Sequence, residues 1–154
     1  MPEAANVHAS AVLTGATAVL IRGPSGSGKS RLAFALIEAG TTCAPFGALR
    51  FARLVGDDRV MLETASGRLL ARPAPALAGL IEIRGLGLRR LPYEAAATIG
   101  LVVDLASPDG ARLPDAAAGT TEILGVSLPR LALPAGVDPV APVLAALRTA
   151  PGPD

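Results

Sequence analysis

Residues 23–30 constrain the fold of this chain more than any other part of its sequence. They read Gly-Pro-Ser-Gly-Ser-Gly-Lys-Ser and match the pattern G-x-x-x-x-G-K-[ST]. A mostly apolar stretch, residues 17–22, precedes them, and a stretch with helical periodicity, residues 29–39, follows. A strand, a glycine-rich loop and a helix in this order form a phosphate-binding unit. The sequence therefore predicts an α/β fold with a nucleotide site.

Each residue type in this loop has a physical role in holding phosphate. Glycines let the backbone turn its N–H groups toward phosphate oxygens, and the helix N-terminus adds partial positive charge. Lys29 is expected to reach the β- and γ-phosphates, and Ser30 to ligate Mg²⁺. Lys29 is also the only lysine among fourteen basic residues, which argues against a chance match. The other predicted nucleotide contacts are Gly23, Pro24, Ser25, Gly26, Ser27 and Gly28.

The composition argues against several classes of protein. At 154 residues the chain is expected to form one domain, residues 1–150, with a disordered tail at residues 151–154. A net charge of +1 gives no broad basic field to attract nucleic acid or a membrane. No apolar run approaches the ~20 residues of a membrane span, and the N-terminus lacks the features of a signal peptide. Cys43 is the only cysteine, interpreted as a structural thiol, so we expect a cytoplasmic protein.

Hydrophobic periodicity and turn residues predict the remaining elements. The predicted strands are residues 7–13, 17–22, 53–55, 60–63, 68–72, 80–84, 99–105 and 122–126. The predicted helices are residues 29–39, with Gly40 as the stop signal, and residues 140–148. Residues 73–78 are expected to form a turn or a short helix, and residues 41–52 a loop.

Three further motifs, in chain order, closely resemble those of HPr kinase/phosphorylase, the bacterial enzyme that modifies a serine of the phosphocarrier protein HPr. They are Asn-Val-His-Ala-Ser at residues 6–10, Leu-Val-Gly-Asp-Asp-Arg-Val at residues 54–60, and Gly-Leu-Ile-Glu-Ile-Arg-Gly-Leu-Gly-Leu at residues 79–88. The resemblance covers residues 6–105 well and the C-terminal third poorly. Because the chain begins close to the first motif, it resembles the short, alphaproteobacterial-type forms that lack an N-terminal domain.

The resemblance implies a single P-loop kinase domain of the phosphoenolpyruvate carboxykinase-like type, with a mixed β-sheet and flanking helices. It implies ATP- and Mg²⁺-dependent phosphorylation of a serine on an HPr-like phosphocarrier of the phosphotransferase system. It also implies the reverse phosphorolytic reaction and a homo-oligomer, often a hexamer.

Asp57 and Asp58 are the candidates for the base that takes the seryl proton, and Asp58 is slightly favoured. Two adjacent carboxylates repel, which can raise the pKa of one into a useful range. The resemblance makes His8 a partner that orients this aspartate. Two plainer interpretations stay open: the aspartates cap a turn, and His8 is an ordinary strand histidine.

Glu82 and Arg84 are expected on one face of a strand, where they can act together. Glu82 is predicted to complete the Mg²⁺ site with Ser30, since this metal prefers oxygen ligands. Arg84 is predicted to neutralise the transferring phosphate. The plainer interpretation is a surface ion pair.

The sequence departs from the family pattern in two places. Residues 41–52 read as an insertion after the helix. Near the C-terminus, where longer members carry an arginine in a Pro-Gly-Arg-Asn-like loop, this chain has Val137, and Arg130 is the nearest arginine. The kinase direction is therefore expected more firmly than phosphorolysis.

Two other functions remain open for a chain with this loop. A small-metabolite kinase would use arginines after the first helix, and Arg50 and Arg53 are placed for that. A nucleotide-binding regulator with little catalysis is the second, because of the missing loop arginine.

Overall fold

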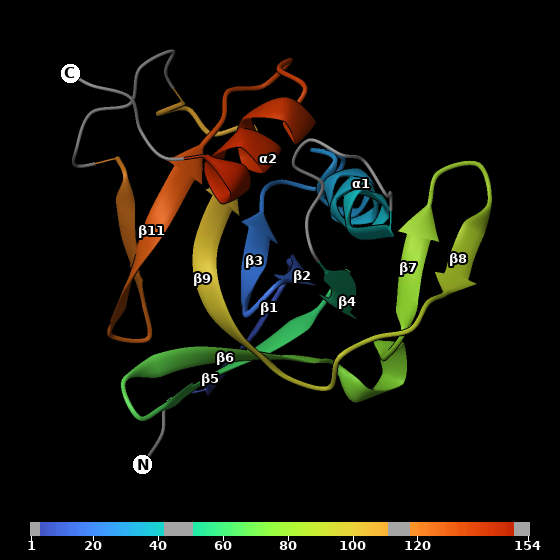
Figure 1. The fold of residues 1–154 in the computed structure, drawn as a ribbon, viewed down its shortest axis with the longest axis horizontal. Coiled ribbons are helices and arrows are strands. Elements are labelled where there is room, and N and C mark those ends of the chain that lie inside the picture. The colour runs from blue at the N-terminus through green and yellow to red at the C-terminus, as the bar shows by residue number, and fades with distance from the viewer. Residues whose placement is uncertain (1–3, 42–50, 111–117, 150–154) are drawn as a thin grey trace.

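Strand β3 (Thr17–Arg22) lies inside a nine-stranded mixed sheet in the computed structural model, which describes residues 4–41, 51–110 and 118–149. The strand order is β1-β5-β6-β9-β3-β2-β4, and β11 pairs with β9 and carries β10 at its edge (Figure 1). Strand β9 runs parallel to β3 and β11, and the other pairings are antiparallel. The remaining strands of this sheet are β1 (Ala4–Val7), β2 (Ser10–Thr14), β4 (Ala52–Gly56), β5 (Val60–Ala65), β6 (Arg68–Pro73), β9 (Ala97–Asp104), β10 (Thr120–Ile123) and β11 (Val126–Ala132).

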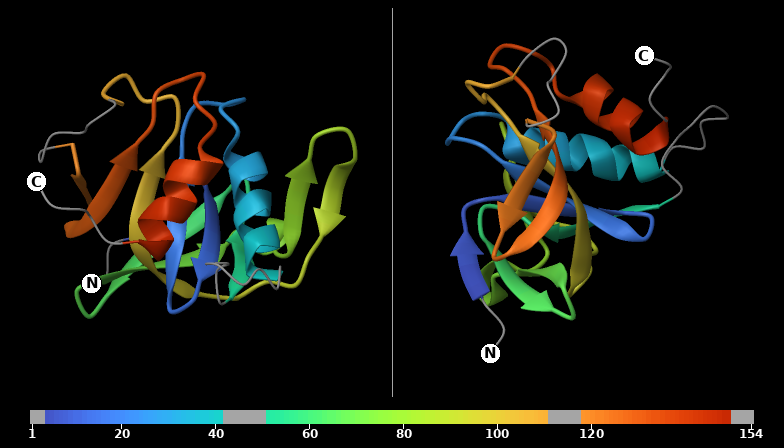
Figure 2. Two further views of the ribbon diagram at one scale, coloured as in Figure 1. Left: turned by 45° about the horizontal axis from the view of Figure 1, so that its top comes forward. Right: turned by 90° about the vertical axis from the view of Figure 1, so that its left-hand side faces the viewer.

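Three short elements and a separate hairpin complete the described fold. Helices α1 (Lys29–Thr41) and α2 (Val140–Arg148) lie side by side over one face of the sheet (Figure 2). A two-stranded sheet of β7 (Leu80–Ile83) and β8 (Gly87–Arg90) stands apart from the main sheet, after the 3-10 helix η1 (Pro75–Leu77). None of the helices in the described part of the chain is long and apolar enough to cross a membrane.

Strand β3 is buried on both faces, as its apolar run predicts. Val19 and Ile21 pack with Leu32 and Leu36 of α1, while Leu20 belongs to a second core cluster on the opposite face. Side chains of a strand alternate between its faces, so one short strand contributes to two cores. Its carboxyl end, where the glycine-rich loop begins, is therefore held firmly from both sides.

The strand predicted at residues 7–13 is in fact two strands. Strand β1 pairs with β5, whereas β2 pairs with β3 and β4, and His8 and Ala9 lie between them. The mostly apolar composition of residues 7–13 hides this break, because both strands bury part of their surface. The break leaves His8 exposed beside the start of β5.

The predicted helix stop at Gly40 is wrong, since α1 continues to Thr41. Gly40 has a packing role instead: a Cβ at this position would lie 2.5 Å from both the Cβ and the N atom of Ala52. The missing side chain thus lets α1 approach the start of β4 closely.

The strand predicted at residues 122–126 is also wrong, because it spans a turn. Leu124 and Gly125 both have positive φ angles, 50° and 79°, and connect β10 to β11 as a tight hairpin. Strand β11 escaped prediction because it contains Pro129, which lies just outside the segment that pairs with β9. Strand β8 was missed as well, since Gly85 lies just before it and Gly87 is its first residue.

The other predicted strands and helix α2 are confirmed, with shifts of one or two residues at some strand ends. Cys43, most of residues 41–52 and the tail at residues 151–154 lie outside the described residues, so the predictions made for them stay predictions.

Candidate functional site

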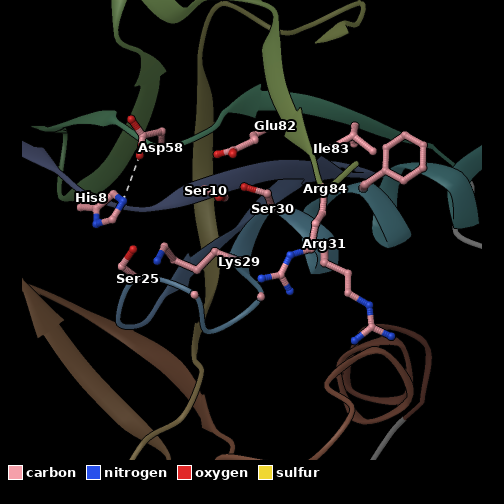
Figure 3. Close-up of a pocket in the computed structure, with 13 residues that line it drawn as sticks. His8, Ser10, Ser25, Lys29, Ser30, Arg31, Asp58, Glu82, Ile83 and Arg84 are labelled. Carbon is pink, nitrogen blue, oxygen red and sulfur yellow. Dashed lines mark hydrogen bonds and ion pairs between the residues drawn. The ribbon is translucent and has the colours of Figure 1, made fainter. Parts of the chain in front are cut away.

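A cavity of about 590 Å³ opens where the glycine-rich loop leads into α1. It is lined by segments that are distant in the sequence: the break between β1 and β2, the loop and the first turns of α1, the turn after β4, and the β7 end of the hairpin (Figure 3). Its lining residues are His8, Ser10, Ser25, Gly26, Gly28, Lys29, Ser30, Arg31, Phe34, Asp58, Glu82, Ile83 and Arg84. The fold thus brings the loop and the three other sequence motifs to one place.

The glycine-rich loop is closed by its own backbone and by Lys29. Gly28 has a φ angle of 97°, a conformation that favours glycine, and its carbonyl accepts the N–H of Leu32 to start α1. The buried Lys29 side chain donates from Nζ to the carbonyl oxygens of Gly23 and Pro24, at 2.9 and 3.0 Å. Burial lowers the pKa of Lys29, while the nearby carboxylates of Asp57 and Asp58 act to raise it. The ammonium is therefore held within the loop.

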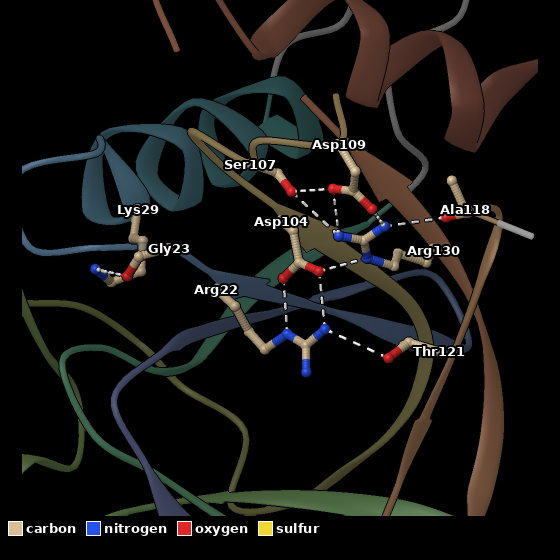
Figure 4. Close-up of polar contacts among 9 residues, drawn as sticks. All are labelled: Arg22, Gly23, Lys29, Asp104, Ser107, Asp109, Ala118, Thr121 and Arg130. Atoms are coloured by element: carbon tan, nitrogen blue, oxygen red, sulfur yellow. Dashed lines mark hydrogen bonds and ion pairs between the residues drawn. The ribbon is translucent and has the colours of Figure 1, made fainter. Parts of the chain in front are cut away.

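A network of charges fixes the strand ends from which the loop departs. Asp104, at the end of β9, accepts two hydrogen bonds from Arg22, at the end of β3, and one from Arg130 on β11 (Figure 4). Arg130 also donates to both carboxylate oxygens of Asp109, to Ser107 and to the Ala118 carbonyl. Burial acts to raise the pKa of Asp104, but the hydrogen bonds from the two arginines lower it below its usual range. These contacts connect the ends of β3, β9 and β11 beside Gly23.

Asp57 is almost fully buried, at 3% exposure, and its carboxylate joins three parts of the site. It accepts hydrogen bonds from Ser10 Oγ at 2.6 Å, from Ser30 Oγ at 2.8 and 2.9 Å, and from the backbone N–H of Glu82 at 3.1 Å. A buried carboxylate needs such donors to offset its lost hydration. Strand β2, the start of α1 and strand β7 are therefore held around one group.

The side chain of Asp58, unlike that of Asp57, lines the cavity. Its φ angle of 66° is in the left-handed region, and the N–H of Arg59 donates to the Asp57 carbonyl at 2.8 Å to close a three-residue turn. The Asp58 side chain is 62% exposed, and its Oδ1 lies 3.0 Å from His8 Nε2. The two adjacent carboxylates therefore have separate partners, and of the two Asp58 is the one that lines the cavity. Strained backbone of this kind is concentrated at functional sites.

Glu82 and Arg84 both line the cavity from the β7 end of the hairpin, as expected from their spacing. Both side chains are exposed, and they form no ion pair with each other or with another described residue. No group of three His, Cys, Asp or Glu side chains in the described ranges is arranged to hold a metal without further ligands.

The sequence interpretation assigned no role to Ser10 or Arg31. Ser10 is fully buried and is followed in its strand by three apolar residues, and that contrast is a signal that its hydroxyl has a specific partner. Arg31 lies in the first turn of α1, where a cation opposes the helix dipole. Its contact with Asp138 is 3.8 Å long and exposed, so this ion pair contributes little.

Arg130 is not placed to replace the arginine that is missing at Val137. Its guanidinium is 13% exposed and fully engaged by Asp104 and Asp109, and Arg130 is absent from the described residues that line the cavity. Arg31 and Arg84 are the arginines that do line it.

Comparison with known proteins identifies the family. Residues 1–142 match the family described as HPr Serine kinase C-terminal domain. The chain belongs to this family. It is 38% identical over 84 residues to the HPr kinase/phosphorylase of Mycoplasma mycoides, covering 54% of this chain and 23% of that relative. It is 33% identical over 127 residues to that of an Exiguobacterium species, covering 75% and 37%.

A solved structure supports the fold. The Hpr(Ser) kinase/phosphatase from Coxiella burnetii matches with a TM-score of 0.73 over 93% of both chains, at 24% identity. The expected family and the mixed α/β fold are therefore confirmed, while the chain spans well under half the length of the curated relatives it matches.

The charge network predicts a large stability cost for Arg130→Ala. Because Asp104 and Arg130 are only 14% and 13% exposed, we expect the free energy of unfolding, measured by urea titration, to fall by about 3 kcal/mol. Arg72→Ala, which breaks the more exposed pair with Glu63, is the matched control and should cost less than about 1 kcal/mol. Since the pKa of Asp104 is lowered, its contribution is complete above about pH 4 and is lost as the pH falls further. Equal losses for the two variants at pH 7 would contradict the network's role.

Replacing the buried aspartate is predicted to lower the free energy of unfolding more than replacing the exposed one. Asp57→Ala leaves the buried Ser10 hydroxyl without its acceptor, so the free energy of unfolding should fall by about 2 kcal/mol. Asp58→Ala removes an exposed carboxylate and should change it by less than about 1 kcal/mol. Urea unfolding followed by circular dichroism measures both, and an Asp57→Ala variant as stable as Asp58→Ala would show that the buried contacts contribute nothing.

Proposed function

We propose that this domain transfers the terminal phosphate of ATP, with Mg²⁺, to a serine of an HPr-like phosphocarrier protein. The observation that carries the proposal is the shared cavity: Lys29 and Ser30 of the glycine-rich loop line it together with Asp58 and its contact His8. Family membership supports the reaction class, because the relatives are named HPr kinase/phosphorylase. The cytoplasmic location and a hexameric assembly remain predictions.

The glycine-rich loop is proposed to act as a phosphate loop of the phosphoenolpyruvate carboxykinase-like type. Its backbone N–H groups and the α1 N-terminus would surround the phosphates. Lys29 would exchange the carbonyls of Gly23 and Pro24 for β- and γ-phosphate oxygens, which are stronger acceptors for a cation.

Oxygen donors at the cavity fit Mg²⁺, which typically binds one or two carboxylates together with phosphate and water. The Glu82 carboxylate and the Ser30 hydroxyl oxygen would hold the ion, and Asp57 keeps Ser30 in place through its hydrogen bonds. When bound, Mg²⁺ would neutralise charge on the β- and γ-phosphates.

Asp58 is proposed as the base. It would take the proton from the seryl hydroxyl as the new oxygen–phosphorus bond forms and the bond from the γ-phosphorus to the bridging oxygen of ADP breaks. The contact between His8 Nε2 and Asp58 Oδ1 would orient the carboxylate. Arg84, which is exposed in the cavity wall and unpaired among the described residues, would neutralise the transferred phosphoryl group. Phosphorolysis is proposed to be weaker, because Val137 replaces the expected arginine and Arg130 is engaged elsewhere.

Incubation with labelled ATP, Mg²⁺ and the HPr-like carriers of the same genome tests the proposal. We expect label on a carrier serine, no detectable transfer by Lys29→Ala, and a roughly 10²- to 10⁴-fold lower kcat for Asp58→Asn with little change in nucleotide affinity. Arg68→Ala is the control, since Arg68 is exposed on β6 and does not line this cavity.

Other outcomes would favour the other readings of the sequence. Label only on a small metabolite would indicate a metabolite kinase, and nucleotide binding without transfer to any carrier would indicate a regulator. Normal transfer by Lys29→Ala would overturn the mechanism.

A further inference from the structure

The β7–β8 hairpin has an exposed apolar tip. Every residue from Arg84 to Arg90 is exposed, and the hairpin projects away from the main sheet (Figures 1 and 2). Leu86 and Leu88 are each 63% exposed, more than any other large apolar side chain in the described residues. Two exposed leucines, two residues apart in the sequence on a projecting hairpin, indicate a surface that is buried when a partner binds.

The same hairpin has a surplus of positive charge. Arg84, Arg89 and Arg90 form no ion pair with any described residue, whereas Arg53 and Arg72 each do. Glu82 is the only acidic residue among residues 80–90, and it faces the cavity. The hairpin therefore offers unpaired guanidinium groups around an apolar tip, which fits a partner with carboxylates around an apolar patch.

The base of the hairpin is fixed while its tip is free. Ile81 is fully buried in the core that α1 covers, and the N–H of Glu82 donates to Asp57. Glu82 and Arg84, in the same hairpin, line the cavity proposed to hold the nucleotide. A molecule held by Leu86 and Leu88 is thereby placed beside the mouth of that cavity.

We propose that the β7–β8 hairpin is the docking surface for the phosphate-accepting protein. Leu86 and Leu88 contact an apolar patch of that protein, and Arg89 and Arg90 pair with carboxylates at its border. Arg84, in the turn of the hairpin, stays with the phosphate in the cavity. This inference rests on the proposed function, since it names the surface that brings the acceptor to the same site.

Steady-state phosphorylation of the HPr-like carrier tests the docking surface with two variants. We expect Leu86→Ser/Leu88→Ser and Arg89→Glu/Arg90→Glu each to raise the KM for the carrier roughly tenfold or more, with kcat and the Kd for ATP within about twofold of the wild-type values. The defect of the arginine variant should depend on ionic strength, because its lost contacts are between charges. An unchanged Kd for ATP shows that each variant is folded. Arg68→Glu, the same kind of charge reversal at an exposed residue of β6, should leave the KM unchanged.

The outcomes separate this inference from the proposed function. Wild-type protein that labels the carrier, with an unchanged KM in both variants, overturns the docking surface alone. Wild-type protein that labels no carrier overturns the proposed function and the docking surface together. A smaller assembly for both variants in sedimentation assigns the hairpin to a contact between copies of this chain, and that result also overturns the docking surface.

Discussion

The buried carboxylate of Asp57 is the group on which the arrangement of the site depends. A carboxylate removed from water is stable only when hydrogen-bond donors replace its hydration. Here the donors come from β2, from the first turn of α1 and from β7, which are far apart in the sequence. Because this one buried carboxylate needs donors from both, the glycine-rich loop and the hairpin are held next to each other, and the pocket forms between them.

The two neighbouring aspartates differ in exposure and therefore in what they contact. The left-handed backbone at Asp58 turns its carboxylate toward His8 and the cavity, while Asp57 stays inside. One carboxylate organises the site, and the other lines the cavity, where it is proposed to take the seryl proton. The charge network around Asp104 complements this, since it fixes the strand ends that carry the loop and leaves Arg130 no role at the cavity.

Elements that depend on local sequence pattern could be predicted from the sequence, whereas features that depend on which strands pair could not. The loop, α1, α2 and the β5–β6 hairpin follow from periodicity and turn residues, and their existence is confirmed. The break at His8 was hidden in a mostly apolar run, because only strand pairing distinguishes β1 from β2. The different burial of Asp57 and Asp58 was equally invisible, since two adjacent residues of one type differ here only in their backbone angles and distant partners.

Hydrogen exchange of the Glu82 amide, measured residue by residue by NMR, tests most directly whether Asp57 holds the site together. In the wild-type chain this amide donates to the buried Asp57 carboxylate, so it should exchange slowly. In Asp57→Ala it should exchange at least about tenfold faster, while amides in the centre of β3 keep their protection. Equal exchange rates for Glu82 in the two proteins would contradict the account.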